Sequence, residues 1–373
     1  MKFKPSHLAL TAVALGTALS ASAQQQVGVE IYGLIGASVT AKTHQGAANG
    51  SLNEVSTNAL NVSYLGFRGR EDLGGGLNAV FRLETSLATD SGLLGKPNGT
   101  SFFDRQSFVG LSGSTWGSVT VGRQFHALTD RTIRTLDVYQ VAAVNAHVVP
   151  LSLYGVNRYA GNDNRSSNAI KYRLDQPQGV QAGLSYALGE VTDSQSKGSS
   201  YSWDLAYLGK GYSVGGGLSS FSSPSTLGTT GILPKHQVWA VGGSMDFGDF
   251  RPYLAYYNST LDSATTAGLK TQSNKITNVS LAWKATNLLV IKGAYYTDKG
   301  TALNNVSGRD GKKNTVVASA EYFLSKRTSV NAIVANNSLS AGYLQEPLYT
   351  AALGRNPNAT SVQFYGLGIN HHF

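Results

Sequence analysis

Basic side chains recur at every second position in several extended stretches of this 373-residue chain. Arg68 and Arg70 lie two residues apart, as do Lys171 and Arg173. Side chains two residues apart in a β-strand point to the same face of the sheet. A face that carries several cations attracts and orients anions, and this requires no bond making or breaking. The residues expected to form this basic face are Arg68, Arg70, Arg82, Arg105, Arg165, Lys171 and Arg173.

Three other polar residues are expected on the same water-facing side, namely Tyr32, Tyr64 and Glu84. The place of Arg105 depends on the strand expected over 103–112. Arg105 joins the basic face if Phe108 points to the opposite, apolar face.

No arrangement typical of an enzyme accompanies these residues. The sequence has no cysteine, no Gly-x-Ser-x-Gly motif, no phosphate-binding glycine loop and no Cys/His metal spacing. His371 and His372 would point to opposite faces of a strand, so they do not form a metal-binding pair. We therefore expect no catalysis, no metal and no cofactor. An outer-membrane lipase or protease stays an alternative, because Ser and His residues are present.

The elements that must position the basic residues are short segments in which apolar and polar residues alternate. The last of them, 361–373, places Tyr365, Leu367, Ile369 and Phe373 on one face and small or polar residues on the other. Such a strand suits a wall between lipid and water. Sixteen strands of this kind are expected near 27–40, 60–71, 76–88, 103–112, 117–124, 166–174, 178–187, 200–209, 211–221, 237–247, 250–260, 274–285, 288–298, 313–325, 327–337 and 361–373.

The connections between these segments alternate strictly between short turns and long polar loops. This pattern is typical of a transmembrane β-barrel and not of a β-sandwich. The sequence therefore predicts an all-β, sixteen-stranded antiparallel transmembrane β-barrel with long external loops and short periplasmic turns. A charge facing lipid at mid-membrane costs about 2–4 kcal/mol, so the basic face is expected to line the lumen. An exported soluble sheet protein of the lectin type is the alternative fold.

The N-terminal region is typical of an exported protein. Residues 1–23 combine a basic start, a short apolar run and a small-residue cleavage site, which predicts a cleaved signal peptide. Residues 24–373 are expected to form a single barrel domain. The formal net charge of +9 favours an anion-attracting lumen over nucleic-acid binding, because the chain is exported.

Several segments in the predicted strands and turns resemble the general porins of Gram-negative bacteria, in particular the β-proteobacterial outer-membrane porins. They lie in the order found in that family and extend over the chain after the signal peptide. They are Val29-Glu30-Ile31-Tyr32-Gly33, residues 64–77, Asp104-Arg105-Gln106-Ser107-Phe108-Val109-Gly110-Leu111, residues 116–124, Arg165-Ser166-Ser167-Asn168-Ala169-Ile170-Lys171-Tyr172, Leu324-Ser325-Lys326-Arg327-Thr328 and the last strand.

The resemblance implies a homotrimer in the outer membrane and a third loop folded into each lumen. It also implies contact with outer-membrane lipids, lipopolysaccharide and the barrel-assembly machinery, with Phe373 closing a C-terminal assembly signal. The third loop corresponds to 125–165, where Asp130 and Asp137 are the expected acidic residues of a constriction. The apolar residues Val141-Ala142-Ala143-Val144 and Val148-Val149 are expected to pack this loop on the inner wall.

The sequence departs from the family pattern in the expected lumen. Tyr64 stands where the family usually has a lumen arginine, Arg70 replaces a smaller polar residue, and the loop lacks a compact acidic cluster. The function expected is a water-filled channel for passive diffusion of small hydrophilic solutes and ions, with a preference for anions. The alternative is a solute-specific channel with a binding track along the lumen.

Overall fold

A computed structural model gives the structure of most of the chain after the expected signal peptide. The described residues are 28–95, 101–139, 145–151, 163–192, 194, 197–222 and 233–373. The signal peptide expected over 1–23 lies outside them, as does the segment 141–144 of the third loop.

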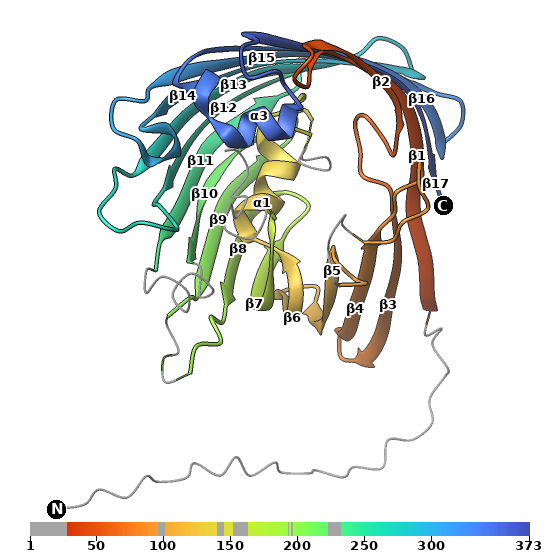
Figure 1. Ribbon diagram of the computed structural model, residues 1–373. Helices are drawn as coiled ribbons and strands as arrows, with labels where there is room; N and C mark the ends of the chain where they lie inside the picture. The colour runs from red at the N-terminus through yellow and green to blue at the C-terminus, as the bar shows by residue number, and fades with distance from the viewer. Residues whose placement is uncertain are drawn as a thin grey trace, which may run out of the picture.

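The described residues form one antiparallel sheet that closes on itself into a barrel (Figure 1). The strands are β1 (Gly28–Gln45), β2 (Gly50–Ser56), β3 (Tyr64–Gly74), β4 (Leu77–Ser86), β5 (Gln106–Gly113), β6 (Gly117–Phe125), β7 (Arg165–Asp175), β8 (Gly179–Ala187), β9 (Ser200–Gly209), β10 (Tyr212–Ser222), β11 (Lys235–Met245), β12 (Phe250–Leu261), β13 (Gln272–Lys284), β14 (Leu289–Thr301), β15 (Gly311–Phe323), β16 (Thr328–Ala341) and β17 (Ser361–His372). Each of the sixteen expected strands is present, which confirms the sixteen-stranded antiparallel barrel.

The remaining strand, β2, was expected to be part of a long loop over 41–59. It pairs with the second half of β1, from Ser38 to Gln45, whereas β3 pairs with the first half, from Gly28 to Leu34. β2 therefore continues the wall beyond the end of β3. It adds to the height of the barrel and not to its circumference.

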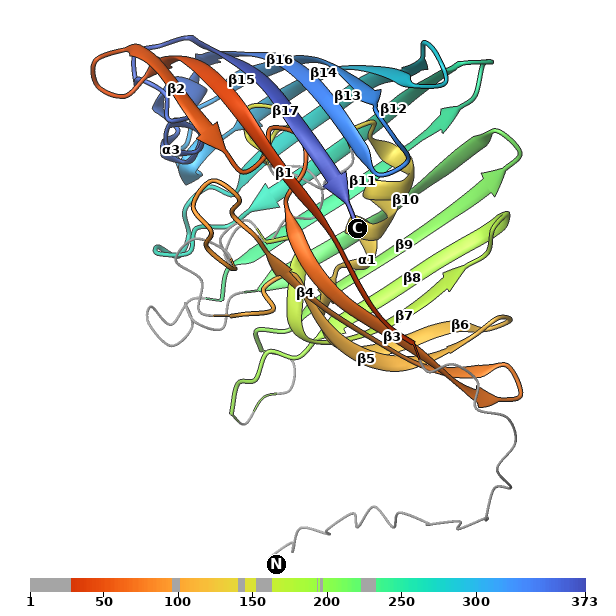
Figure 2. The same ribbon diagram turned by 90° about the vertical axis from the view of Figure 1, so that its right-hand side faces the viewer.

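The barrel closes where the last strand meets the first. Leu34 of β1 pairs with His372 of β17, and the register continues to Lys42 and Phe364. Gly33 and Phe373 then exchange both backbone hydrogen bonds at 3.2 Å, so the C-terminus lies beside β1 (Figure 2). Closure leaves no open sheet edge, which a hydrocarbon layer does not tolerate.

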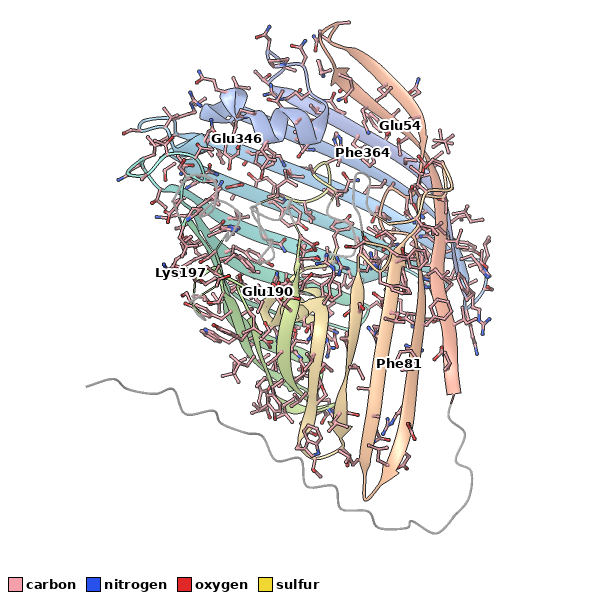
Figure 3. The ribbon with its side chains drawn as sticks, turned by 60° about the horizontal axis from the view of Figure 1, so that its bottom comes forward. Glu54, Phe81, Glu190, Lys197, Glu346 and Phe364 are labelled. Carbon is pink, nitrogen blue, oxygen red and sulfur yellow. The ribbon has the colours of Figure 1, made fainter. Side chains whose placement is uncertain are left out.

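Side chains project from the two faces of the wall as the alternation predicts (Figure 3). Outward positions are apolar and exposed, as at Leu184 of β8 and Leu367 of β17. Inward positions carry small, polar or charged residues, with Ser202 and Asp204 of β9 fully or almost fully buried. The opposite character of the two faces fixes the register, because a shift by one residue would exchange them.

The helices in the described parts of the connections are all short. They are α1 (Ala127–Arg131), the π-helical turn η1 (Thr132–Leu136), the 3-10 turns η3 (Leu303–Asn305) and η4 (Gly342–Gln345), and α3 (Pro347–Leu353). In the part of the chain that is described, no helix has both the length and the apolar character needed to cross a membrane.

The third loop folds into the barrel, with α1 inside the wall (Figure 1). Leu128, Leu136 and Val138 of this loop join Val148 and Val149 in one buried apolar cluster. The inner wall contributes apolar side chains of β11–β17 to the same cluster, which are Val238, Ala240, Ala255, Tyr257, Ile276, Ala294, Tyr296, Val317, Ile333, Ala335 and Phe364. Burying these surfaces stabilises the loop against one side of the lumen.

An arginine on the outer face should destabilise the barrel far more than one on the inner face. Leu184→Arg places a charge against hydrocarbon and should lower the free energy of unfolding by about 2–4 kcal/mol. Val80→Arg, at an inward position of β4 that lines a cavity, is the control and should change it little. Urea titration of folding into phospholipid vesicles measures both values, and equal losses would contradict the assignment of the faces.

Candidate functional site

A polar cavity of about 600 Å³ lies between the third loop and the inner wall of β1 and β3–β7. Its lining contains six cationic side chains and three carboxylates, so charges of the two signs do not cancel. The cations are Arg68, Arg70, Arg82, Arg134, Lys171 and Arg173, and the carboxylates are Glu30, Asp130 and Asp175. Five of the seven basic residues proposed from the sequence thus line one cavity, whereas Arg105 and Arg165 do not belong to its lining.

Glu84 of β4 lies behind this cavity and organises two of the arginines. Its carboxylate accepts hydrogen bonds from Tyr32 Oη at 2.6 Å and from Gln106 Nε2 at 3.0 Å. Arg82 Nη1 lies 3.8 Å and Arg105 Nε 3.7 Å from the same carboxylate. Because Glu84 is almost fully buried, it holds both guanidinium groups without being open to solutes.

Two tyrosine rings support the guanidinium groups of the cluster. Arg68 lies over the ring of Tyr32, with 4.7 Å from Cζ to the ring centroid, and also forms a two-point ion pair with Glu30 at 2.7 and 2.8 Å. Arg105 lies over the ring of Tyr64 at the same distance of 4.7 Å. Such cation–π contacts are worth about 0.5–2 kcal/mol and restrict the orientation of the guanidinium plane.

The structure does not meet the condition on which the place of Arg105 depended. Phe108 points into the barrel and lines the cavity, whereas Val109 and Leu111 are exposed on the outer face. Arg105 still reaches Glu84 because it precedes β5, which begins at Gln106, and its side chain does not follow the alternation of that strand. A residue next to a strand end is not governed by the period of two.

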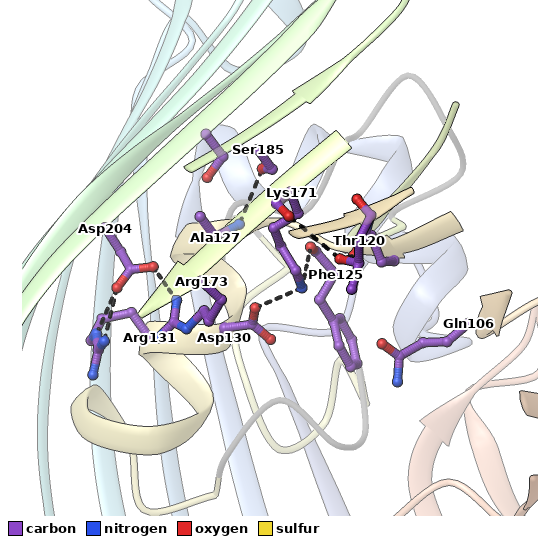
Figure 4. A network of polar contacts seen from close by, with 12 residues as sticks. Gln106, Thr120, Phe125, Ala127, Asp130, Arg131, Lys171, Arg173, Ser185 and Asp204 are labelled. Carbon is purple, nitrogen blue, oxygen red and sulfur yellow. Dashed lines mark hydrogen bonds and ion pairs between the residues drawn. The ribbon is translucent and has the colours of Figure 1, made fainter. Parts of the chain in front are cut away.

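A second network attaches the third loop to the wall (Figure 4). Arg131 of α1 is fully buried and donates from Nε to Asp204 of β9 at 2.9 Å and from Nη1 to Gln181 of β8 at 2.8 Å. Arg173 of β7 binds the other oxygen of Asp204 and also Asp175 at 2.8 Å. One carboxylate, Asp204, therefore joins a loop arginine to a wall arginine.

The two acidic residues expected at a constriction occupy different places. Asp130 accepts a hydrogen bond from Lys171 Nζ at 2.9 Å and lines the cavity. Burial alone would raise the pKa of the Asp130 carboxyl, but Lys171 and Arg173 outweigh it and hold this pKa below the ordinary value. Asp137 lies away from the basic wall and accepts from Tyr296 Oη of β14 at 2.8 Å.

Arg165, at the start of β7, is buried beside the end of the third loop. Its Nη1 donates to Asn164 Oδ1 at 2.8 Å and lies 3.7 Å from Asp163, and its Cζ lies 4.0 Å from the ring centroid of Phe125. These contacts hold the loop end against the wall. All of these contacts are made with other groups of the protein.

Two histidines of the third loop add no charge near neutral pH. Burial lowers the pKa of His126 to about 3 and that of His147 to about 3. His147 stacks on Phe364 of β17 with ring centroids 5.0 Å apart, which matches a neutral ring.

Asp204 was missed by reasoning from the sequence, although a signal existed. It follows Ser200 and Ser202 at a spacing of two, and all three are buried on the inner face of β9. The direction of its partner Arg131 could not be predicted in this way, because side chains in a loop do not alternate between two faces. Across the described ranges, no group of three or more His, Cys, Asp or Glu residues is arranged to hold a metal ion.

Comparisons with known proteins agree with this architecture. Residues 9–342 match the family described as Gram-negative porin. The major outer membrane protein P.IB of Neisseria meningitidis is 29% identical over 390 residues, covering 99% of this chain and 100% of the relative. Outer membrane porin protein 32 of Delftia acidovorans is 28% identical over 383 residues, covering 99% and 100%.

Solved structures show the same fold. An anion-selective porin from Comamonas acidovorans superimposes with a TM-score of 0.73 at 23% identity, covering 93% of this chain and 100% of that one. The trimer form of OmpT from Vibrio cholerae gives a TM-score of 0.66 at 14% identity, covering 94% and 100%. The chain therefore belongs to the Gram-negative porin family, whose members are passive diffusion channels of the outer membrane and not enzymes.

Proposed function

We propose that this outer-membrane channel prefers anions. The observation that carries the proposal is the surplus of cations in the cavity beside β3–β7, with six basic side chains against three carboxylates. A narrow path with low-dielectric walls focuses the field of such a surplus on a passing ion. The match to a solved porin described as anion-selective supports the same direction.

The third loop directs solutes toward that surplus. Its apolar residues pack on the inner faces of β11–β17, and Tyr139 Oη of the loop donates to the backbone oxygen of Lys292 at 3.1 Å. Asn337 of β16 donates to the backbone oxygen of His147 at 2.9 Å. With that side of the lumen filled, the polar cavity along β3–β7 is the route that the geometry favours for hydrated solutes.

A homotrimer is the assembly that we propose. Exposed tyrosine and tryptophan side chains are frequent on the outer face of β7–β15, where they suit the lipid headgroup level. In β1, β5 and β6 the exposed outward residues are aliphatic instead, as at Val29, Ile31, Val39, Val109 and Val121. A smooth aliphatic face of this kind suits contact with another copy, and one structural relative is described as a trimer.

Neutralising the most accessible cations of the cavity should abolish the anion preference. The triple variant Arg68→Gln, Arg70→Gln and Arg134→Gln removes three of the six positive charges and leaves the three carboxylates. The reversal potential across planar bilayers under a KCl gradient should therefore shift toward zero or to the cation side. The control triple Lys275→Gln, Lys299→Gln and Lys312→Gln loses the same charge from the outer face and should keep the wild-type potential. Cation preference of the wild type, or no shift in the lumen variant, would refute the proposal.

Removing Asp204 should release the third loop. Asp204→Ala leaves Arg131 buried without its carboxylate, and breaking a buried ion pair costs about 3–5 kcal/mol. We expect a larger and noisier single-channel conductance. Arg131→Met should have a smaller effect, because Arg173 still neutralises Asp204. Equal conductance in wild type and both variants would show that this network does not hold the loop.

A further inference from the structure

We propose that the polar cavity of the lumen binds aromatic carboxylates, with the carboxylate on Arg82 of β4 and the aromatic ring against Phe108 of β5. Such a site rests on the anion preference proposed above and specifies the class of anion that binds. Arg82 and Phe108 are direct partners in the β4–β5 ladder, and both line the cavity. The Cβ atoms of such a pair lie about 5 Å apart, a separation that a carboxylate joined directly to a benzene ring can span.

Arg82 is able to bind the carboxylate. Its Nη1 lies 3.8 Å from Glu84, outside hydrogen-bond distance, and 37% of its side-chain surface is exposed. Arg82 also pairs directly with Arg68 of β3, whose guanidinium donates to Glu30 at 2.7 and 2.8 Å. Because like charges in a direct cross-strand pair repel each other, an anion at Arg82 is attracted by both arginines. A guanidinium can hold the two oxygens of one carboxylate by two parallel hydrogen bonds.

The inward positions next to Phe108 carry no side chain. They are Gly110, two residues further along β5, and Gly122, the direct partner of Phe108 in β6. A Cβ at Gly110 would collide with the backbone oxygen of Val119, and one at Gly122 with that of Ser107. The atoms nearest to Gly122 are backbone atoms of Ser107 and Phe108, and not the ring of Phe108. The ring is thus not folded down onto Gly122, and it stays accessible from the cavity.

A second aromatic ring, that of Phe125, lines the same cavity at the end of β6. The guanidinium of Arg165 lies over this ring, with 4.0 Å from Cζ to the ring centroid. Lys171 Nζ donates to the backbone oxygen of Phe125 at 3.3 Å and to Asp130 at 2.9 Å. Figure 4 shows the Phe125 ring in the space between Lys171 and Gln106. The cavity therefore places two aromatic rings among its cations.

Packing of the third loop does not account for these two rings. That loop packs on the apolar cluster of β11–β17, and the buried apolar clusters of the described residues include neither Phe108 nor Phe125. Both side chains are instead partly exposed and line the cavity. An apolar ring that faces water gains free energy when another apolar group covers it. Aromatic rings favour offset-stacked or edge-to-face contact with a second ring, so an aromatic solute is the partner that they suit.

Rings and charge together distinguish this class of solute from other small anions. Chloride and phosphate interact with the cations alone, and a saturated carboxylate presents no aromatic face to Phe108 or Phe125. The cavity of about 600 Å³ has a size usual for a small-molecule site. An aromatic ring that carries a carboxylate uses both the guanidinium of Arg82 and the ring beside it.

The test measures block of the KCl current by benzoate and by cyclohexanecarboxylate. The second anion carries the same charge and the same number of carbon atoms on a saturated ring. Single channels of the purified protein in planar bilayers give the concentration of each anion that halves the current. Benzoate should halve the wild-type current at about fivefold lower concentration than cyclohexanecarboxylate. Acetate, which has the charge without a ring, should block more weakly than benzoate.

Three variants separate the contribution of the ring from that of the charge. Phe108→Leu should remove most of the difference between benzoate and cyclohexanecarboxylate, whereas Phe108→Tyr keeps an aromatic face and should retain it. Arg82→Gln should weaken block by both anions, because both carboxylates need the guanidinium. The matched control Phe247→Leu removes an exposed phenylalanine ring from the short turn between β11 and β12 and should be blocked like the wild type.

The wild type alone can overturn the proposal, whether or not the variants fold. Equal blocking concentrations of benzoate and cyclohexanecarboxylate, or block by acetate as strong as by benzoate, would refute an aromatic site. An undiminished difference in Phe108→Leu would show that Phe108 does not form it. The reversal potential of the same wild-type channels separates the two failures. Chloride preference without a benzoate effect leaves the anion preference standing, whereas cation preference removes the anion preference itself.

Discussion

Pairing of every backbone amide and carbonyl within the hydrocarbon layer is the constraint on which the rest of this structure depends. A sheet meets it only by closing, and here the closure is the pairing of β1 with β17, ending in the reciprocal bonds of Gly33 and Phe373. Once the sheet is closed, each side chain of the wall points either to the lipid or to the lumen. The basic residues of β3, β4 and β7 then point to the lumen, because a charge against the hydrocarbon layer costs free energy.

The inner wall is divided, and this division explains where the polar cavity lies. Inward positions of β11–β17 include Val238, Ile276, Ile333 and Phe364, so an apolar loop segment gains free energy by covering them. Inward positions of β3–β7 carry arginine and lysine, whose desolvation under a loop would be costly. The same loop therefore fills one side of the lumen and leaves the basic side open, and the attachment of Arg131 to Asp204 fixes the boundary between the two.

The sequence predicted the barrel well because the period of two is a direct consequence of strand geometry. It failed where that period does not apply. β2 lies within a long connection and gains its pairing only from the part of β1 that β3 leaves free. Arg105 stands one residue before a strand, and the inward position of Phe108 had no signal beyond an uncertain strand start. The partners of Arg131 depend on how an aperiodic loop crosses the lumen, which is a property of three-dimensional packing.

Ion pairs within the basic wall reduce the charge that an approaching ion senses. Six cations line the cavity, yet Arg68 faces Glu30, Lys171 faces Asp130, and Arg134 shares Asp175 with Arg173. The paired groups keep their geometry and give a solute fixed hydrogen-bond donors, while their fields largely cancel at a distance. The surplus is what an approaching ion senses from afar, and Arg70, held by the amide oxygen of Asn78, belongs to it. A wall built in this way separates two tasks, since its carboxylates hold the cations in place and its excess charge decides which ions enter.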